Sequence, residues 1–375
     1  MKVVVAIDSL KGSLTSMEAG RAIKEGVLAS HSDAEVVVKP LADGGEGTTD
    51  ALIEGLKGEQ IDLSVTGPLG KPIHTYYGYL NDTRTAIMEM ASAAGIILIS
   101  EEEKDPLTAT TYGVGEMIRD AAEKGCRDFI IGIGGSATND GGIGMLKALG
   151  YLFLDENGQD VGEGAQALSK VAVIGRANVY PKLSECHFRI ACDVTNPLCG
   201  PNGATYIYGP QKGVTEEMKA SLDADMAHYA KVTAETFGTD YSETPGAGAA
   251  GGLGFAFLSY LNAELTPGIE LILNAVELEK ELAGADIVVT GEGRLDHQTA
   301  MGKAPIGVAR LAKKHGAKVL AFAGGVTKDA TACNAAGIDA FFPIVRGITT
   351  LEEAMKPKNA RANMIASVEQ VFRLL

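Results

Sequence analysis

Charged side chains and glycines recur directly after the strands predicted near both ends of the 375-residue chain. The carboxyl ends of parallel strands meet at one edge of a sheet, and ligands bind at that edge. The residues that follow the predicted strands there are Asp8, Lys11 and Ser13; Asp43 and Glu46; Glu292, Arg294, Asp296 and Gln298; Gly324 and Gly325; and Arg346.

This mixture of residue types indicates phosphoryl transfer. Carboxylates alone would suggest a metal site, and cations alone would suggest an anion site. Mg²⁺ commonly takes one or two carboxylates and completes its shell with waters and phosphate oxygens. Carboxylates, cations and glycine loops at one edge therefore suit a magnesium ion together with a phosphate group.

A second candidate segment is "GIGGSATNDGGIG" (Gly132–Gly144), in which six of thirteen residues are glycine. It lies between a predicted strand and a predicted helix, so its backbone N–H groups could approach an anion. Gly134, Gly135, Ser136, Thr138 and Asn139 are the candidate phosphate-binding residues. A tight, closely packed turn explains the same glycines equally well. The segment lacks the Gly-Lys-Ser/Thr of a Walker P-loop and is not a clean dinucleotide fingerprint.

Two further segments allow both a functional and a structural interpretation. The cluster "PGAGAAGGLG" (Pro245–Gly254) could bind an anion or bring two helices close together. In "CDVTNPLCGPNGA", Asp193 follows a predicted strand and could accept a proton from a substrate hydroxyl. An Asx turn that ends the strand is the structural alternative.

The elements that must position these residues alternate between strand and helix at both ends of the chain. "VVVAI" (3–7) has the short, β-branched pattern of a strand buried on both faces. The helix pattern that follows begins with a capping box at Thr15 and Glu18. Such alternation predicts a parallel sheet covered by helices. We expect one discontinuous α/β domain over 1–62 and 285–375, with a second α/β domain inserted over 63–284.

The composition excludes several classes of function. The net charge of −15 disfavours binding to nucleic acid or to anionic lipid. The five cysteines are scattered and form no CxxC pair, so neither a zinc site nor a disulfide framework is expected. The first residues are typical of a buried strand rather than a signal peptide, and no apolar run approaches the ~20 residues of a membrane span. We expect a cytoplasmic protein, and a homo-oligomer is compatible with the sequence.

Taken together, the motifs resemble the bacterial glycerate kinases of the two-domain, type-1 family. They occur in family order and cover nearly the whole chain: "DSLKGSLT", "PLADGGEGT", "VTGPLG", "GIGGSATNDGGIG", "CDVTNPLCGPNGA", "PGAGAAGGLG", "TGEGRLDHQTAMGKAPIGVA" and "AGG". The resemblance implies a flavodoxin-like domain with an inserted domain and an active site in a cleft between them. It also implies phosphorylation of D-glycerate by ATP with Mg²⁺, giving 2-phosphoglycerate and ADP.

Within that resemblance, the candidate residues take the following hypothetical roles. Asp193 is the first choice for the base, Asp43 is the second, and Lys11 completes the catalytic set. Glycerate is held by residues drawn from Lys11, Ser13, Arg294, Arg346 and Asp296. Mg²⁺ is held by one of Asp8, Asp43 and Asp296, and the nucleotide lies on Gly134, Gly135, Ser136, Thr138 and Asn139, with Lys303 as a charge partner.

Three alternatives stay open. Phosphorylation at the 3-position would make the protein a glycerate 3-kinase. A Mg²⁺-dependent acid-sugar enzyme would use the same carboxylates without ATP. A protein that binds small hydroxy acids without catalysis is the third.

Overall fold

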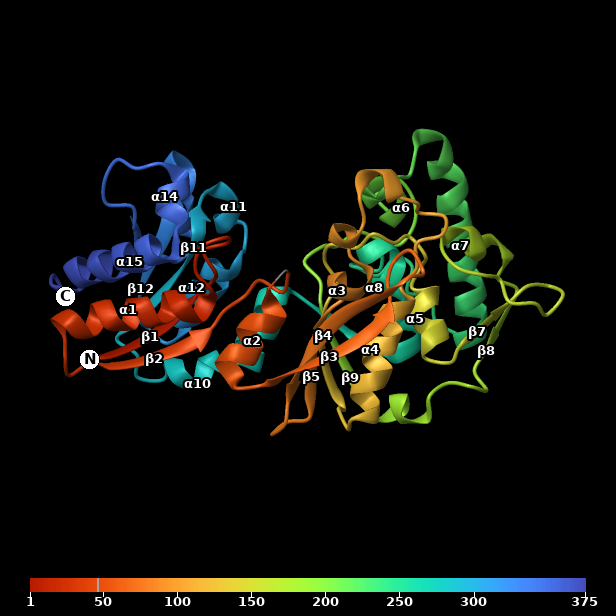
Figure 1. Cartoon of the computed structure of the whole chain (residues 1–375), viewed down its shortest axis with the longest axis horizontal. Coiled ribbons are helices and arrows are strands. Elements are labelled where there is room, and N and C mark those ends of the chain that lie inside the picture. Colours follow the sequence, from red (N-terminus) through yellow and green to blue (C-terminus); the bar gives the residue numbers. More distant parts are fainter. Residues whose placement is uncertain (46) are drawn as a thin grey trace. The chain divides into compact units, whose positions relative to one another are not determined.

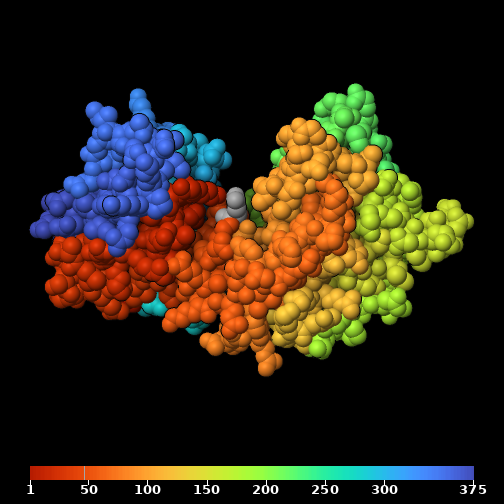
Figure 2. Space-filling model, in the orientation of Figure 1, coloured from red at the N-terminus to blue at the C-terminus, as the bar shows by residue number. Residues whose placement is uncertain are grey.

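The computed structural model describes residues 1–45 and 47–375, so the prediction for Glu46 lies outside the described residues. The chain divides into two compact units. Unit 1 comprises Met1–Asp43, Asp50–Lys57 and Ile269–Leu375, and unit 2 comprises Gly44–Thr49 and Gly58–Gly268. Both ends of the chain therefore build unit 1, and red and blue surfaces adjoin on it in Figure 2.

The helices and strands of unit 1 are those of a doubly wound α/β fold (Figure 1). They are β1 (Lys2–Ile7), α1 (Ser16–Ser30), β2 (Glu35–Pro40), α2 (Thr48–Leu56), α9 (Gly268–Ala275), α10 (Leu278–Leu282), β11 (Ile287–Leu295), α11 (His297–Ala300), α12 (Ala304–Lys314), β12 (Lys318–Val326), η6 (Lys328–Thr331), α13 (Ala332–Ala335), β13 (Ala340–Pro343), α14 (Leu351–Met355) and α15 (Pro357–Phe372). Helices α9 and α10, which the sequence placed in the inserted domain, belong with unit 1 apart from Gly268.

Unit 1 contains a five-stranded sheet in the order β13-β12-β11-β1-β2, and all of its strand pairs are parallel. Read from the β2 edge in the unit's own strand order, this is 2-1-3-4-5, the flavodoxin-like order. The order reverses between β1 and β11, so the crevice at this switch point is where such a sheet binds ligands.

Helices α1 and α15 lie side by side and cover one face of this sheet (Figure 1). Val3, Val5 and Ile7 of β1 pack in the same core cluster as both helices. Because side chains alternate along a strand, Val4 and Ala6 face the opposite side, and these residues are completely buried as well. The predicted capping box is confirmed, since Thr15 Oγ1 accepts the Glu18 N–H and Glu18 Oε2 accepts the Thr15 N–H.

Strands β11 and β12 extend further than the sequence indicated. Their register runs on to the pair Leu295 and Val326, so Glu292 and Arg294 lie on β11 instead of in a loop after it. Gly324 and Gly325 likewise lie on β12. The reason is tertiary: each strand continues because the other supplies its hydrogen-bond partners.

Unit 2 mixes strands and helices around a second sheet. Its elements are β3 (Glu59–Thr66), β4 (Pro72–Leu80), β5 (Thr85–Glu89), α3 (Ala91–Ala94), η1 (Ile96–Leu98), η2 (Glu101–Glu103), α4 (Tyr112–Glu123), β6 (Asp128–Gly132), α5 (Ile143–Ala148), β7 (Leu152–Leu154), η3 (Ala165–Lys170), β8 (Val173–Gly175), η4 (Pro181–Glu185), β9 (His187–Ala191), α6 (Ala204–Tyr208), η5 (Pro210–Lys212), α7 (Glu216–Phe237), α8 (Ala249–Leu261) and β10 (Glu264–Thr266).

The main sheet of unit 2 has the order β10-β9-β6-β5-β4-β3. The pairs β3–β4 and β4–β5 are antiparallel, and β5, β6, β9 and β10 run parallel. One row of the register joins the last residues of the four parallel strands, namely Glu89, Gly132, Ala191 and Thr266. These four strands therefore all end at one edge of the sheet.

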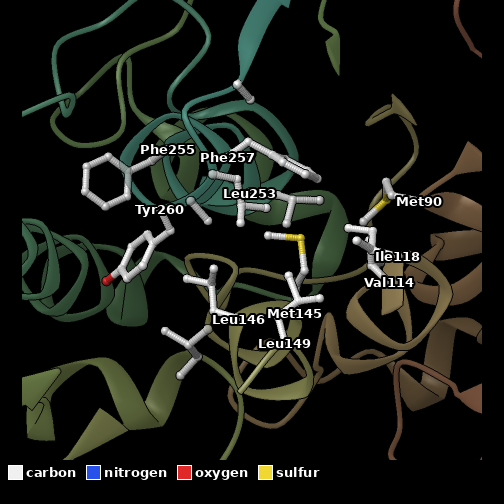
Figure 3. Close-up of a cluster of buried hydrophobic side chains, with 14 of the residues drawn as sticks. Met90, Val114, Ile118, Met145, Leu146, Leu149, Leu253, Phe255, Phe257 and Tyr260 are labelled. Atoms are coloured by element: carbon white, nitrogen blue, oxygen red, sulfur yellow. The ribbon is translucent and has the colours of Figure 1, made fainter. Parts of the chain in front are cut away.

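The core of unit 2 is built largely by α4, α5 and α8 (Figure 3). Leu253 of α8 lies toward Met145 and Leu146 of α5 in Figure 3, whereas the rings of Phe255 and Phe257 pack with Tyr229 and Phe188. Leu253, Phe255, Phe257, Met145 and Leu146 are each at most 1% exposed. This packing fixes the segment between β6 and α5, because α5 cannot move without opening the core.

Candidate active site

The carboxyl edge of unit 1 gathers acidic side chains around the switch point. Asp8 follows β1 directly and is only 8% exposed. Burial raises the pKa of Asp8 to about 7, and repulsion from Asp43 and Glu292 adds to this effect. A hydrogen bond from the Ser9 N–H, at 2.7 Å, and the charge of Lys11 act in the opposite direction. A group with this electrostatic environment is typical of a functional site.

Glu292 and Asp296 are held by the turn that leads into α11. Thr299 Oγ1 donates a hydrogen bond of 2.6 Å to Glu292 Oε1. Burial raises the pKa of Glu292, and this bond and the charge of Lys303 oppose the shift. Asp296 Oδ1 accepts the N–H groups of Gln298 and Thr299 and so caps α11. The cap occupies one oxygen of Asp296, just as the Ser9 N–H occupies one oxygen of Asp8, and the second oxygen of each accepts no backbone N–H bond from the described residues.

A cavity of about 500 Å³ opens at this edge. The structure brings most of the predicted unit 1 residues to its wall, and the opposite wall is apolar. The predicted residues that line it are Asp8, Lys11, Ser13, Asp43, Glu292, Arg294, Asp296, Lys303, Gly324 and Gly325. The apolar wall is formed by Leu10, Ile344, Val345, Leu351, Ala354, Met355 and Ala360.

The cations of the site differ in their placement. Lys11 is exposed, and Arg294 lies 3.9 Å from Asp296 with 70% of its side chain exposed. Lys303, predicted to accompany the glycine-rich segment of the other domain, instead lines this cavity near Glu292. Arg346 borders a separate hollow with Gly347 and Asn359 and does not line the cavity.

Within residues 1–45 and 47–375, no group of three or more His, Cys, Asp or Glu side chains is arranged to hold a metal ion. Mg²⁺ does not require such a group, because one or two carboxylates suffice when phosphate oxygens and waters supply the other ligands. Asp8 and Asp43, which repel each other, are the pair that a divalent cation would neutralise. Ser13 Oγ, also on the wall, is buried and makes no hydrogen bond to any described residue.

The carboxyl edge of unit 2 holds a second set of candidate residues. Asp193 lies two residues beyond β9, and its Oδ1 accepts the Gly268 N–H at 2.8 Å. Glu89, at the end of β5, accepts the N–H groups of Gly47 and Thr49. Gly134 and Gly135 follow β6 and are exposed. Glu89 was missed by the sequence analysis because its pattern indicates only a strand.

The remainder of the glycine-rich segment turns inward. Thr138 and Asn139 are completely buried, and the Asn139 amide donates to Thr205 Oγ1 at 3.1 Å. Asp140 is also completely buried. Its carboxylate accepts the Gly142 and Gly144 N–H groups at the start of α5, together with the Thr111 N–H and hydroxyl. Burial raises the pKa of Asp140, and these bonds oppose that shift. Asp140 therefore holds the start of α5 through its carboxylate.

The two glycine clusters of unit 2 pack against each other. Gly251 has φ +68°, and a Cβ there would lie 2.1 Å from the Thr138 carbonyl oxygen. A Cβ on Gly252 would lie 2.8 Å from the Gly141 Cα. The Gly141 N–H donates to the Gly251 carbonyl at 3.0 Å. For these residues, close packing is the interpretation that the structure supports.

A buried lysine, which the sequence analysis did not single out, completes this region. Lys212 of η5 is 1% exposed, and its Nζ donates to Ser136 Oγ at 2.6 Å and to the Thr138 carbonyl at 2.7 Å. Burial lowers the pKa of Lys212 to about 7, whereas Asp140 acts in the opposite direction. No sequence signal identifies it, since "GPQKGV" resembles an ordinary polar turn.

Comparison with known proteins matches residues 3–375 to a model of the glycerate kinase family. The chain belongs to the glycerate kinase family. The glycerate kinase of Bacillus subtilis (strain 168) is 46% identical over 95% of this chain and 93% of that protein. The glycerate 2-kinase of Escherichia coli (strain K12) is 46% identical over the same shares. A crystal structure assigned to glycerate kinase 2 of Salmonella typhimurium LT2 superposes with a TM-score of 0.92 at 44% identity, covering 100% of this chain and 98% of that one.

These findings confirm the expected family and the mixed α/β fold class. Membership of a kinase family implies a nucleotide substrate. All five cysteines are free. In the described part of the chain, no helix has both the length and the apolar character to cross a membrane. The roles of individual residues stay predictions, and so does an active site shared by the two domains.

Proposed function

We propose that this member of the glycerate kinase family transfers the γ-phosphoryl group of ATP to the 2-hydroxyl of D-glycerate. The products are 2-phosphoglycerate and ADP. The observation that carries this proposal is the cavity at the switch point of unit 1, where carboxylates and cations share one wall. The family match over nearly the whole chain and the E. coli relative named as a 2-kinase support it.

The carboxylates of unit 1 fit a magnesium ion. Asp8 and Asp43 are the residues that would hold it, because both line the cavity and repel each other, so a cation would neutralise the pair. Asp296, which also lines the cavity, is the third candidate. A bound Mg²⁺ supplies positive charge to the phosphate oxygens during transfer. Glu292 also lines the cavity, and its carboxylate is held in place by the hydrogen bond from Thr299. We assign it no metal-binding role.

Cations on the same wall suit the anionic acceptor. Lys11, with Ser13 beside it, and Arg294 would bind the carboxylate of glycerate. Lys303 would neutralise a phosphate oxygen near Glu292. Arg346 is no longer part of this set, because it lies outside the cavity wall. Such catalysis acts by positioning and by charge neutralisation more than by covalent chemistry.

Asp193 is the proposed base of the reaction. Its carboxylate is oriented by the Gly268 N–H, and it would accept the proton of the attacking hydroxyl. Asp43 is the second candidate for this role. The exposed Gly134 and Gly135, with Ser136, are the proposed contacts for the nucleotide phosphates, whereas the buried Thr138 and Asn139 would support them from behind.

The proposal includes the surroundings of the enzyme. We propose a cytoplasmic enzyme that acts on a small molecule and, given its net charge of −15, binds no nucleic acid. A homo-oligomer is compatible with this function, and light scattering of the purified protein measures it directly.

A coupled assay of ATP consumption with D-glycerate and Mg²⁺ tests the reaction, and NMR of the product identifies the phosphorylated position. Asp193→Asn and Asp43→Asn should each lower kcat by at least about 100-fold if they carry the assigned roles. Asp82→Asn and Asp33→Asn change exposed aspartates of units 2 and 1 and serve as matched controls. Failure to consume ATP refutes the kinase, and 3-phosphoglycerate as product refutes the position. Near-wild-type turnover in both folded variants refutes the assigned roles.

A further inference from the structure

Lys212 places an amine in the interior of unit 2 with only neutral oxygens as hydrogen-bond partners. Those partners are the Ser136 hydroxyl at 2.6 Å and the Thr138 carbonyl at 2.7 Å. Asp140 acts on the amine through its charge, but the Asp140 carboxylate already receives hydrogen bonds from Thr111, Gly142 and Gly144. Lys212 is therefore buried without the close carboxylate partner that usually accompanies such a residue.

Filling space does not explain this lysine. A buried ammonium loses its hydration, and a methionine of similar length would fill the same volume without that loss. The lost hydration destabilises the charged form of the amine, so burial lowers the pKa of Lys212 to about 7. A residue that disfavours its own charged form in this way is a candidate for a functional role.

The two partners of Lys212 belong to the segment that leaves β6 at the carboxyl edge of the sheet. Lys212 is separated from them by more than seventy residues in sequence, so it joins η5 to this segment. Ser136 Oγ accepts the bond from Lys212, which leaves the hydroxyl proton of Ser136 to be donated elsewhere. Just before it, Gly134 and Gly135 are exposed, and a Cβ at Gly134 would meet nothing within 4 Å.

The segment that Lys212 contacts also carries buried side-chain oxygens without a hydrogen-bond partner. Thr138 Oγ1 and Asn139 Oδ1 are buried and have no hydrogen-bond partner among the described residues. A segment that served only as a closely packed turn would not need a buried cation and spare oxygens beneath it. The inner face of the segment is thus charged and polar, and its outer face at Gly134 is open.

We propose that Lys212 is a positioning residue for phosphate binding, holding Ser136 and Thr138 so that the Gly134–Ser136 segment receives a phosphoryl oxygen of the nucleotide. A phosphoryl anion bound at the segment favours the protonated form of this amine, and the resulting positive charge lies behind the segment without touching the anion. This inference rests on the proposed function for the identity of the anion. It adds the Gly134–Ser136 segment of unit 2 to the residues that bind nucleotide phosphates.

Lys212→Met tests the inference, with Lys147→Met as the matched control. Lys147 is another mostly buried lysine of unit 2, but its partners are Asp160 and Glu163. Titration calorimetry with ADP and with adenosine separates the phosphate contact from the nucleoside contact. We expect Lys212→Met to weaken ADP binding at least tenfold and adenosine binding less than twofold. In turnover, the KM for ATP should rise while the KM for glycerate changes little.

A purely structural lysine would behave differently. It would lower the melting temperature and leave the affinity of the folded protein for ADP unchanged, and that result overturns the inference. Ser136→Ala should weaken ADP binding in the same direction. The double variant should lose less than the product of the two single losses, because Lys212 acts through Ser136. If Lys212→Met does not fold, unchanged ADP binding by Ser136→Ala alone overturns the inference.

The outcomes also separate this inference from the proposed function. If the wild type turns over ATP with glycerate and ADP binding does not depend on Lys212, only the inference fails. If ADP binding depends on Lys212 but glycerate is not phosphorylated, only the proposed function fails.

Discussion

Replacing Asp8 with asparagine should stabilise the metal-free protein while abolishing its activity. Asp8 is buried at the switch point, where burial and the neighbouring carboxylates raise its pKa from 3.8 to about 7. Asparagine is uncharged and keeps an oxygen that can accept the Ser9 N–H. It therefore removes a buried negative charge that the folded state tolerates poorly in the absence of a cation.

The sign and size of this effect follow from proton linkage. Between pH 3.8 and about 7 the folded state holds a proton on Asp8 that the unfolded state has lost, so stability falls as the pH rises through this window. At about 1.4 kcal/mol per pKa unit, the loss is about 1.6 kcal/mol at pH 5 and about 4 kcal/mol at pH 8. Asp8→Asn escapes this loss. Its stability advantage should therefore grow by about 2–3 kcal/mol from pH 5 to pH 8.

Calorimetric unfolding of both proteins in EDTA measures the advantage at each pH. Comparing the two proteins at the same pH cancels the titration of other groups. Because the two units can unfold separately, the transition of unit 1 must be followed on its own. Asp33→Asn, which changes an exposed aspartate of unit 1, is the matched control. An advantage of the same size at pH 5 and pH 8 would refute the reasoning. Adding Mg²⁺ should shrink the advantage, because the wild type alone gains a bound cation.

Three further predictions concern the packing and charge of both units. Gly251→Ala should lower the free energy of unfolding of unit 2 by at least about 2 kcal/mol more than Gly158→Ala. Both glycines have positive φ, but a Cβ at Gly251 would meet a carbonyl oxygen, whereas a Cβ at Gly158 would meet nothing within 4 Å. Equal losses in urea unfolding would contradict the packing of the two glycine clusters. Asp140→Ala should lower stability by at least about 3 kcal/mol, since it leaves buried N–H groups of α5 without an acceptor. Asp155→Ala, at a half-buried residue whose carboxylate also accepts backbone N–H groups, should lower stability by less than about 1 kcal/mol. The reverse order of the two losses would show that the bonds of Asp140 are unimportant. Lys303→Met should raise the KM for ATP more than tenfold in the coupled assay, because Lys303 lines the cavity. Arg346→Met should change the same KM less than twofold, because Arg346 lies outside that cavity. Comparable effects of the two substitutions would contradict these placements.

Local signals predicted much of the fold. The β-branched run of β1 and the capping box at Thr15 and Glu18 depend on neighbouring residues alone, and both are confirmed. The extension of β11 to Leu295 could not be predicted, because it depends on pairing with β12 far along the chain.

The candidate site was predictable where it depends on strand ends, and unpredictable where it depends on burial. Asp8, Asp43 and Asp296 could be grouped from sequence because parallel strands end at one edge, and all three line one cavity. Glycine patterns could not show that Gly251 packs on Thr138 while Gly134 faces outward. Lys212 gave no signal, since only the folded chain reveals a lysine in the interior.

The discontinuity of unit 1 has a consequence for biosynthesis. Strands β1 and β2 leave the ribosome early, but β11, which pairs with the free side of β1, follows after about 250 further residues. At about 5–20 residues per second, translation leaves this apolar pair without its neighbour for roughly 12–50 s. Unit 2, apart from its short 44–49 segment, is encoded continuously and can mature during this interval. The nascent chain therefore needs protection at its amino end, and we expect chaperone engagement to concentrate there until the carboxyl-terminal third is synthesised.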